Sequence, residues 1–556
     1  MGVYLNSKKP YTVYRKTVQS PYFVDKTAIL EELIPIVQPD RGEPAAFQAG
    51  GRDLRYICIT RPRRFGKTVM AGMIASFFGK GEDSRHIFRQ LAISSYMQFE
   101  EHLNKHNVIY VPFNEIPKSC TSYEQYINRI EHRLISDLKR SFPHVGIDEN
   151  DAVWNALNMI YELEDSAEFI FVLDEWDFIY HQEFVSDEDK RAFTKFLSVL
   201  LKDQPYVEMA YMTGILPITK YSSGSELNMF QEYSMATREK YSEYFGFTDA
   251  EVDILYKKYL EIQKEPKITR RELEIWYDGY QTMSIKRLYN PRSVVCALSD
   301  NQLGSYWTSS GPYDEIYYYV KNDISHIRDD ITSMMTGTPV PANVQEYSST
   351  SMQLTTRDEI YSAMVVYGFL SYSNGYVSIP NKELMDKFAD MVRQKPDFGY
   401  IYRLAEESGR MLEATKSGDT KTMTEILERA HNTESPLIRY SNEAELSKVI
   451  TFVYLQAREY YDIQQENRSG TGYVDYIFYP YRKEDDGIII ELKVDDTADS
   501  AIQQILDRKY AQNFDGKLGE ERRCTGRILA VGIAYDKKDG QKRHTCKVKV
   551  LREKLH

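Results

Sequence analysis

The chain has 556 residues, with 70 Lys and Arg against 82 Asp and Glu and a formal net charge of -12 at pH 7. At roughly 100–200 residues per domain, this length predicts about three domains. An apolar fraction of 42% excludes a wholly disordered chain. The acidic balance argues against a protein that holds nucleic acid through an overall basic surface, so any such contact must be local.

Five scattered cysteines without a CxxC pair argue against a disulfide framework or a thiolate zinc site. The sequence contains no run of about 18 apolar residues, and its first residues lack the apolar core of a signal peptide. We therefore expect a cytoplasmic protein in a reducing compartment, with no membrane association.

The first half of the chain alternates apolar runs with helical patterns, after a Pro- and Gly-rich segment that is expected to be an exposed loop (38–53). Strands interleaved with helices are typical of a doubly wound parallel α/β sheet. The expected strands are 54–60, 108–113, 169–174 and 207–213.

Gly66-Lys67-Thr68 stands between the first strand and a helix expected over 69–78, and this arrangement has the shape of a P-loop. Backbone N–H groups of such a loop hold phosphates, the lysine reaches the β- and γ-phosphates, and the threonine hydroxyl binds Mg²⁺. The full motif has glycine five residues before Gly66, where this chain has Arg61.

A second motif strengthens this interpretation, because the strand 169–174 ends in Asp174 and is followed by Glu175. Asp174 is suited to orient the Mg²⁺ shell, and Glu175 to polarise a water for attack on the γ-phosphate. The alternative is a simple turn and an unrelated acidic pair. Three arginines crowd the loop, either as phosphate clamps or as a solvated charged face: Arg61, Arg63 and Arg64. Thr213-Gly214 lies either where a γ-phosphate sensor would be or in an ordinary turn.

The middle of the chain is helical over 251–280 and has two short helices flanking a hairpin over 357–392, with Asn374-Gly375 as the turn. Helices with a hairpin indicate either a winged-helix element or a structural spacer. A last α/β module follows, with a helix over 443–460 and another over 497–512. Its expected strands are 473–479, 488–494, 527–535 and 545–551.

Asp475 in one strand and Glu491-x-Lys493 in the next predict a second site, because residues i and i+2 of a strand share a face. Two carboxylates suit Mg²⁺, and a neighbouring lysine can position or deprotonate a water. A buried Asp–Lys ion pair is the alternative. Two helix residues could face the same sheet. One is Gln504, and the other is Glu443 or Glu445, because the helical pattern does not show which of these two points to the sheet. Residues 507–556 carry 14 Lys and Arg against 7 Asp and Glu, either a nucleic-acid surface or a solvated tail.

These residues resemble the bacterial AAA-ATPase-like family whose members carry a C-terminal PD-(D/E)XK nuclease-superfamily domain. The matching segments span most of the chain and include 22–27, 60–68, 173–177, 213–215, 245–248, 277–280, 289–291, 442–443 and 488–494. The missing first glycine is a habit of that family. Two departures are Trp176, where the family usually has Tyr, and Leu446-Ser447, where it usually has Tyr-His.

The resemblance implies a nucleotide site made by seven residues: Arg63, Arg64, Phe65, Gly66, Lys67, Thr68 and Asp174. It implies Mg²⁺ ligands at Thr68 and Asp174 in the nucleotide site, with Glu175 as the catalytic group. It implies a second set of Mg²⁺ ligands in the nuclease part, with Lys493 as the catalytic group: Glu443 (preferred over Glu445), Asp475 and Glu491. By analogy, such proteins act in defence against foreign DNA or in the upkeep of mobile elements.

The fold expected is α/β throughout: a P-loop NTPase-type doubly wound parallel sheet (1–265), a helical or winged-helix-like middle (266–400) and a C-terminal α/β domain of restriction-endonuclease type (401–556). The expected function is an ATPase coupled to a Mg²⁺-dependent nuclease that acts on DNA more than on RNA, as a monomer or a homo-oligomer. The alternative is a nucleotide-switched scaffold whose nuclease-like domain only binds nucleic acid.

Overall fold

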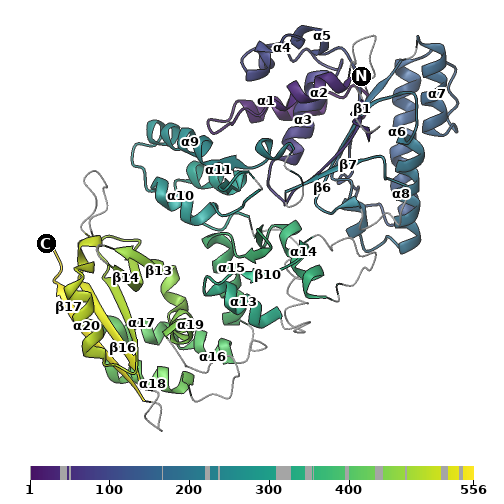
Figure 1. Ribbon diagram of the computed structural model, residues 1–556. Coiled ribbons are helices and arrows are strands. Elements are labelled where there is room, and N and C mark those ends of the chain that lie inside the picture. Colours follow the sequence, from purple (N-terminus) through teal and green to yellow (C-terminus); the bar gives the residue numbers. More distant parts are fainter. Residues whose placement is uncertain are drawn as a thin grey trace. The chain divides into compact units, whose positions relative to one another are not determined.

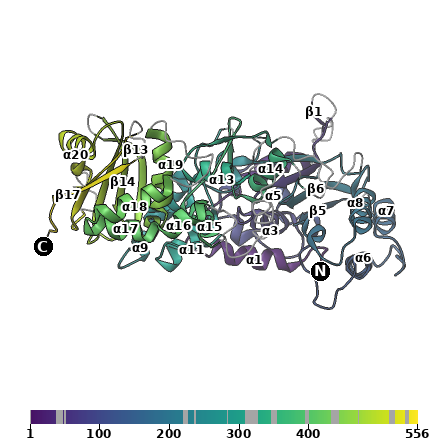
Figure 2. The ribbon, with the colours of Figure 1, turned by 90° about the horizontal axis from the view of Figure 1, so that it is seen from below.

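The chain divides into two compact units in the computed structural model (Figures 1 and 2), Met1–Ile316 with Pro341–Leu384 and Tyr317–Val340 with Met385–His556. The division into 1–265, 266–400 and 401–556 stays a prediction. The structure describes residues 2–37, 47–48, 52–165, 167–218, 226–235, 238, 240–282, 284–307, 327–344, 354, 356–394, 400–431, 443–469, 472–514, 524–536 and 543–555.

A five-stranded sheet with the order β4-β5-β6-β3-β7 forms the centre of the first unit, and all its pairings are parallel. The strands are β3 (Tyr56–Thr60), β4 (Asn107–Pro112), β5 (Phe169–Asp174), β6 (Val207–Gly214) and β7 (Gln231–Ser234). The predicted doubly wound sheet is confirmed. Strand β7 was not predicted, because Tyr233 is its one apolar residue. Within the expected loop 38–53, β1 (Phe47–Gln48) pairs antiparallel with β2 (Arg52–Asp53).

Alternating side chains of this sheet enter two hydrophobic cores, one on each face. Ile57 and Ile59 pack among α1 (Lys8–Val18), α2 (Ile29–Val37) and α3 (Lys67–Phe78). Cys58 packs on the other face, against α6 (Tyr123–Ser141), α7 (Val153–Leu163) and α8 (Asp187–Leu201). Figure 1 shows these two helical layers on opposite sides of the strands. Two short helices, α4 (Arg85–Phe88) and α5 (Phe99–His102), lie near α3.

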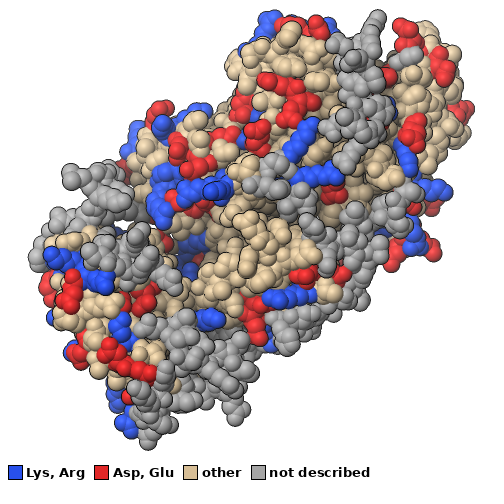
Figure 3. Space-filling view, in the orientation of Figure 1, with Lys and Arg blue, Asp and Glu red and all other residues tan. Residues whose placement is uncertain are grey.

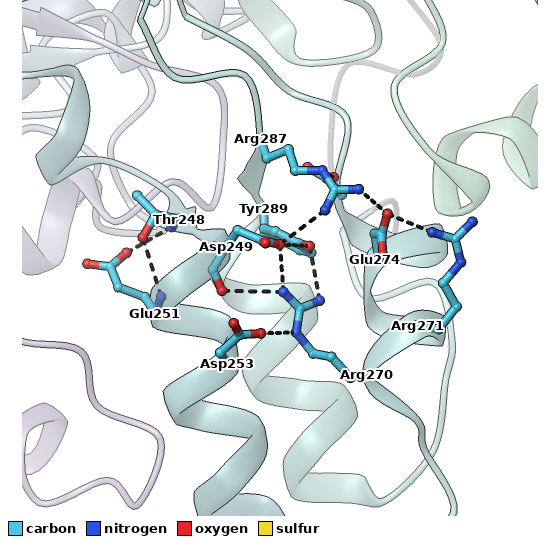
Figure 4. A network of polar contacts seen from close by, with 10 residues as sticks. Thr248, Asp249, Glu251, Asp253, Arg270, Arg271, Glu274, Arg287 and Tyr289 are labelled. Carbon is cyan, nitrogen blue, oxygen red and sulfur yellow. Dashed lines mark hydrogen bonds and ion pairs between the residues drawn. The ribbon is translucent and has the colours of Figure 1, made fainter. Parts of the chain in front are cut away.

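A group of three helices follows the sheet: α9 (Asp249–Ile262), α10 (Arg270–Tyr277) and α11 (Pro291–Asp300). The expected helical stretch 251–280 is therefore two helices. Figure 4 shows how polar side chains join α9, α10 and the segment just before α11: Arg270 donates to Asp249 and Asp253 at 2.6 Å each, and the Tyr289 hydroxyl also donates to Asp249 at 2.6 Å. Tyr289 belongs to β9 (Leu288–Tyr289), which pairs with β8 (Phe247–Thr248) and leads into α11. The start of α11 is held in place by this network.

The middle segment has the predicted helix–hairpin–helix order, α14 (Arg357–Tyr367), β11 (Ser371–Ser373), β12 (Tyr376–Ser378) and α15 (Lys382–Gln394). Asn374 and Gly375 both have positive φ, of 51° and 84°, as a two-residue hairpin turn requires. In chain order, the described residues between the two five-stranded sheets also form five helices and one short strand. They are α13 (Ile327–Met335), β10 (Val340–Pro341), α16 (Tyr400–Glu406), α17 (Ser408–Ser417), α18 (Thr420–His431) and α19 (Glu443–Val453).

A second five-stranded sheet, in the order β13-β14-β15-β16-β17, is mixed: β15 and β16 are parallel, and the other pairs are antiparallel. The strands are β13 (Tyr461–Ser469), β14 (Gly472–Pro480), β15 (Gly487–Val494), β16 (Ile528–Tyr535) and β17 (His544–Arg552). Helix α20 (Ala498–Asp507) connects β15 to β16 and packs on the sheet face that holds Ile489. Strand β13 was not predicted, because its sequence YDIQQENRS is largely polar. Within the described ranges, no helix is long and apolar enough to cross a membrane.

Candidate functional site

The turn between β3 and α3 is built to receive an anion. Helix α3 begins at Lys67, and Gly66 caps it with a φ of 91°, a conformation that favours glycine. A Cβ added to Gly66 would meet nothing within 4 Å, so the space in front of the helix N-terminus is open. The unpaired N–H groups and the positive end of the helix dipole make this a natural phosphate site.

Lys67 lies within the loop and is buried, with 6% of its surface exposed. Its ammonium donates to the carbonyl oxygens of Arg61 at 2.8 Å and of Pro62 at 2.9 Å. Burial lowers the pKa of Lys67 to about 8, against the opposing effect of nearby carboxylates, of which Asp177 and Glu175 contribute most. The Lys67 ammonium thus bonds the loop carbonyls and also feels the charge of nearby acidic side chains.

Asp174 ends strand β5, and the neighbouring strand β6 holds it in position. Its Oδ1 accepts a hydrogen bond from the Thr213 hydroxyl at 2.6 Å, whereas its buried Oδ2 has no hydrogen-bond partner among the described residues. Burial raises the pKa of Asp174. A buried carboxylate oxygen without a donor is costly unless a cation meets it, so this residue fits a Mg²⁺ ion bound near the loop.

Glu175 follows Asp174 in a left-handed conformation, with a φ of 53°, and its backbone N–H donates to the Thr213 hydroxyl at 3.4 Å. Burial, and next the charge of Asp174, raise the pKa of Glu175, while a hydrogen bond from Asn114 opposes the shift. A raised pKa suits a group that accepts a proton from water. Sequence reasoning missed Asn114, whose only signal is its position just after β4 (Asn107–Pro112).

A cavity of about 630 Å³ opens at this loop, a size that suits a nucleotide. Seven residues expected at the nucleotide site or as its catalytic group line it: Arg63, Arg64, Phe65, Gly66, Lys67, Thr68 and Glu175. The opposite walls come from distant segments, with Tyr14 and Phe23 from the N-terminal region and Arg292 from α11. Segments far apart in the chain therefore meet around one space, and the chain order alone reveals only the loop and the acidic strand end among them.

Arg61 is neither a phosphate clamp nor part of a solvated face. It is buried, with 1% of its surface exposed, and its guanidinium donates to the backbone oxygens of Thr60 and Tyr233 at 2.8 and 2.7 Å. It also lies over the Phe245 ring, 5.1 Å from the centroid. Arg61 ties β3 to β7, which explains structurally why a large residue stands where the full motif has glycine.

Gly214 ends strand β6 beneath the acidic residues and has no room for a side chain. A Cβ there would lie 2.5 Å from the Trp176 ring and 2.8 Å from Asp177 Oδ1. The other carboxylate oxygen of Asp177 accepts hydrogen bonds from the backbone N–H groups of Ile215 and Leu216, at 2.9 and 2.7 Å. Thr213-Gly214 is therefore a tightly packed strand end rather than an ordinary turn.

Gly214→Ala is expected to destabilise the first unit by about 1–3 kcal/mol, because Trp176 and Asp177 must move to admit the methyl group. Gly72→Ala is the matched control: Gly72 is also buried, lies inside α3, and has no atom closer than 4.0 Å to its added Cβ. This control should be neutral or stabilising by up to about 1 kcal/mol. Calorimetric midpoints of the two variants provide the measurement, and equal midpoints would contradict the packing argument.

The second candidate site lies where the ladder between β14 and β15 ends. Tyr476 pairs with Ile490, so Asp475 and Glu491 occupy the next positions along the two strands. Asp475 Oδ2 accepts a hydrogen bond from the backbone N–H of Leu492 at 2.7 Å, in place of a ladder bond. The antiparallel pairing brings together the two carboxylates that the sequence placed in separate strands.

Glu491 is almost fully buried, and its two oxygens have different surroundings. Oε1 accepts from the Lys493 ammonium at 3.1 Å and from the Gln504 side chain of α20, while no residue in the described part of the chain hydrogen-bonds the buried Oε2. Burial, and next the charge of Asp475, raise the pKa of Glu491 to about 7. One oxygen oriented by two donors and one without a donor fit a Mg²⁺ ligand.

The third expected ligand, Glu443, is the first residue of α19, but its side chain and that of Glu445 lie outside the described residues. Among the side chains that are described, no three His, Cys, Asp or Glu converge as a metal-binding group. Ser447 stands where the resemblance expects histidine, and its hydroxyl hydrogen-bonds the Tyr476 hydroxyl at 2.6 Å. In this chain that position ties α19 to β14.

The basic residues of the last 50 positions are only partly described. Arg527 pairs with Asp486 at 2.5 Å, and Lys547 pairs with Asp499. In the space-filling view, basic and acidic side chains are interspersed over the visible face (Figure 3). Six of the 14 basic residues lie outside the described part of the chain: Lys517, Arg522, Arg523, Lys537, Lys538 and Lys542.

Two family models match the chain: residues 51–223 match the AAA-ATPase-like family, described as "Predicted AAA-ATPase", and residues 442–544 match a family of the PD-(D/E)XK nuclease superfamily. An uncharacterized protein from the vnfD 5' region of Azotobacter chroococcum mcd 1 is 24% identical over 298 residues, 52% of this chain and 51% of that protein. The match thus spans about half of the relative's length.

Two solved structures are also similar to the chain. The Walker-type ATPase of Pyrococcus abyssi has 11% identity and a TM-score of 0.33, with 59% of this chain and 89% of that chain covered. The ORC2 protein of Aeropyrum pernix, solved in ADPNP–ADP complexes, has 11% identity and a TM-score of 0.31, with 64% and 97% covered.

Proposed function

The chain joins an AAA-ATPase-like domain (51–223) to a PD-(D/E)XK nuclease-superfamily domain (442–544), and we propose that it couples ATP hydrolysis to Mg²⁺-dependent cleavage of nucleic acid, DNA more than RNA. One kind of observation carries the proposal. Each domain holds a buried carboxylate oxygen that no described residue hydrogen-bonds, Asp174 Oδ2 and Glu491 Oε2, and each stands beside a lysine. At each site, a bound divalent cation would satisfy the oxygen there.

In the ATPase half, the loop N–H groups would bind the β- and γ-phosphates, with Lys67 turning from its carbonyl partners to the γ-phosphate. Thr68 and Asp174 would hold Mg²⁺, which supplies charge neutralisation when bound. Glu175, which lines the cavity, would accept the proton of the attacking water.

In the nuclease half, Asp475, Glu491 and Glu443 would hold Mg²⁺, which polarises the scissile phosphate when bound. Lys493 would orient or deprotonate the attacking water, and its ion pair with Glu491 keeps the ammonium at the site. Gln504 would keep the Glu491 carboxylate oriented.

The deciding experiment incubates the full chain with mixed single- and double-stranded DNA and RNA and Mg²⁺, with and without ATP. Phosphate release and strand cleavage are followed together. ATP-dependent cleavage supports the proposal, whereas ATP hydrolysis with tight nucleic-acid binding and no cleavage in Mg²⁺ or Mn²⁺ favours the nucleotide-switched scaffold.

Cleavage is expected to need more Mg²⁺ at low pH. Because the pKa of Glu491 is raised to about 7, the carboxylate is mostly protonated below that value, and a proton competes with the metal. The Mg²⁺ concentration for half-maximal cleavage should rise by up to roughly tenfold per pH unit below 7 and level off above about pH 8. Circular dichroism across the same pH range controls for unfolding, and a flat Mg²⁺ requirement would contradict this assignment.

A further inference from the structure

Several backbone carbonyls of the phosphate-binding loop accept hydrogen bonds from identified donors. Lys67 takes those of Arg61 and Pro62, and the Gly246 N–H takes that of Phe65 at 3.4 Å. The carbonyl of Arg63 is held from outside the sheet domain, by the indole N–H of Trp307 at 3.1 Å.

Trp307 reaches the loop at the Arg63 carbonyl. It is buried, with 6% of its surface exposed, and it is not among the residues that line the cavity, whereas Arg63 and Arg64 are. In a trans peptide the C=O and the following N–H point in opposite directions. The peptide bond between Arg63 and Arg64 therefore turns its N–H away from the indole.

Arg64 needs such an anchor, because its φ of 70° lies in the left-handed region. For a residue with a Cβ this conformation costs about 1 kcal/mol or more and persists where neighbours impose it. Both chain neighbours of Arg64 are held in place. Before it, the Arg63 carbonyl accepts the Trp307 hydrogen bond. After it, the Phe65 ring packs edge-on against Tyr280, with 5.0 Å between the ring centroids.

Trp307 is in turn held by Glu383, in the first turn of α15. The Glu383 carboxylate is buried, with 2% of the residue exposed, and accepts hydrogen bonds from the Trp307 backbone N–H at 2.6 Å and the Ser293 hydroxyl of α11 at 2.8 Å. The Trp307 ring packs edge-on against Phe369, 5.1 Å between centroids. A Cβ on Gly368 would lie 2.7 Å from Pro62, so this segment fits closely against the loop.

We propose that Trp307, held by Glu383, is a positioning residue of the nucleotide site: it fixes the Arg63–Arg64 peptide so that the Arg64 N–H faces the bound phosphates. This role rests on the proposed binding of ATP at the loop. Helix α15 continues beyond Leu384 as part of the second unit. A change in this helix can therefore alter nucleotide affinity through two hydrogen bonds.

Trp307→Phe in the full chain removes the indole N–H and keeps an aromatic ring. The KM for ATP should rise about fivefold, the effect of one hydrogen bond, with kcat changed less than about twofold. Trp276→Phe is the matched control, because the buried Trp276 indole nitrogen has no hydrogen-bond partner within the described ranges and its loss should leave KM unchanged.

Glu383→Gln keeps the Trp307 ring in place and replaces one acceptor oxygen by an amide, so it serves if Trp307→Phe fails to fold; a KM increase of about threefold is expected. An unchanged KM in these variants, or a fall in kcat alone, overturns the positioning role. If they bind ATP normally while Lys67→Ala does not, only this role fails. If wild type does not bind ATP either, the proposed function and this inference fail together.

Discussion

Replacement of Lys67 by alanine is expected to lower kcat/KM for ATP hydrolysis by at least about 10²-fold. The Lys67 ammonium is buried within hydrogen-bond reach of the loop carbonyls and close to Asp177, Glu175 and Asp174. Phosphate bound at this helix N-terminus would lose the lysine that neutralises it, while the acidic side chains would remain.

The matched control is Lys195→Ala, which removes an exposed lysine from α8 of the same unit. Phosphate release and equilibrium binding of a fluorescent ATP analogue measure the effect in both variants. Because burial lowers the pKa of Lys67, the folded state holds this charge at a desolvation cost, and the variant should fold. Hydrolysis at the wild-type rate in Lys67→Ala would remove the ATPase half of the proposal.

If Glu491 is a metal ligand as proposed, Glu491→Ala is expected to reduce Mg²⁺-dependent cleavage by at least about 10³-fold, because such a ligand supplies several kcal/mol of charge stabilisation. Glu491 is also the group that holds Lys493 at the site and accepts from Gln504. Its loss should therefore disturb the metal and the lysine together. ATP hydrolysis in the absence of nucleic acid should stay at the wild-type level.

Glu425→Ala, at an exposed position of α18 in the same unit, is the control for general damage. Glu491→Gln keeps the size of the side chain and should be equally inactive, which separates loss of the metal ligand from loss of packing. Gel analysis of end-labelled substrates measures cleavage, and calorimetry of Mg²⁺ binding measures the ligand role. Wild-type cleavage in both Glu491 variants would rule out this carboxylate as part of a nuclease site.

The sequence predicted the first sheet well, because its central strands are continuous apolar runs that only a two-sided core accommodates. It placed Asp174 at a strand end, which is confirmed, and Lys67 just before a helix expected from residue 69, whereas the helix begins at Lys67 itself. It could not reveal Trp307 or Asn114, which come to the loop from other segments through packing. Nor could spacing decide what Arg61 does, since its partner Tyr233 is 172 positions away in an unpredicted strand.

The second sheet was predicted from shorter signals. Alternation in β14 and the apolar run of β15 were enough to place Asp475 near Glu491, and the Gln504 contact agrees with its expected position facing the sheet. Strand β13 escaped prediction because edge strands carry polar residues on both faces. Ser447 was noted as a departure, but its bond to Tyr476 needed the fold.

The sequence by itself determined where the two candidate sites lie, a loop between a strand and a helix with an acidic strand end nearby, and two carboxylates and a lysine on adjacent strands. Local patterns suffice there because strand periodicity and helix starts depend on near neighbours. The overall charge of -12 pointed away from nucleic acid, since a sum over the chain hides where charges lie. Only the tertiary structure decided which carboxylate oxygens lack donors among the described residues, and that Arg61 connects β3 to β7. It alone showed the hydrogen bonds from Trp307 to the loop and to Glu383. The reason is that burial and long-range hydrogen bonds arise only when distant segments pack.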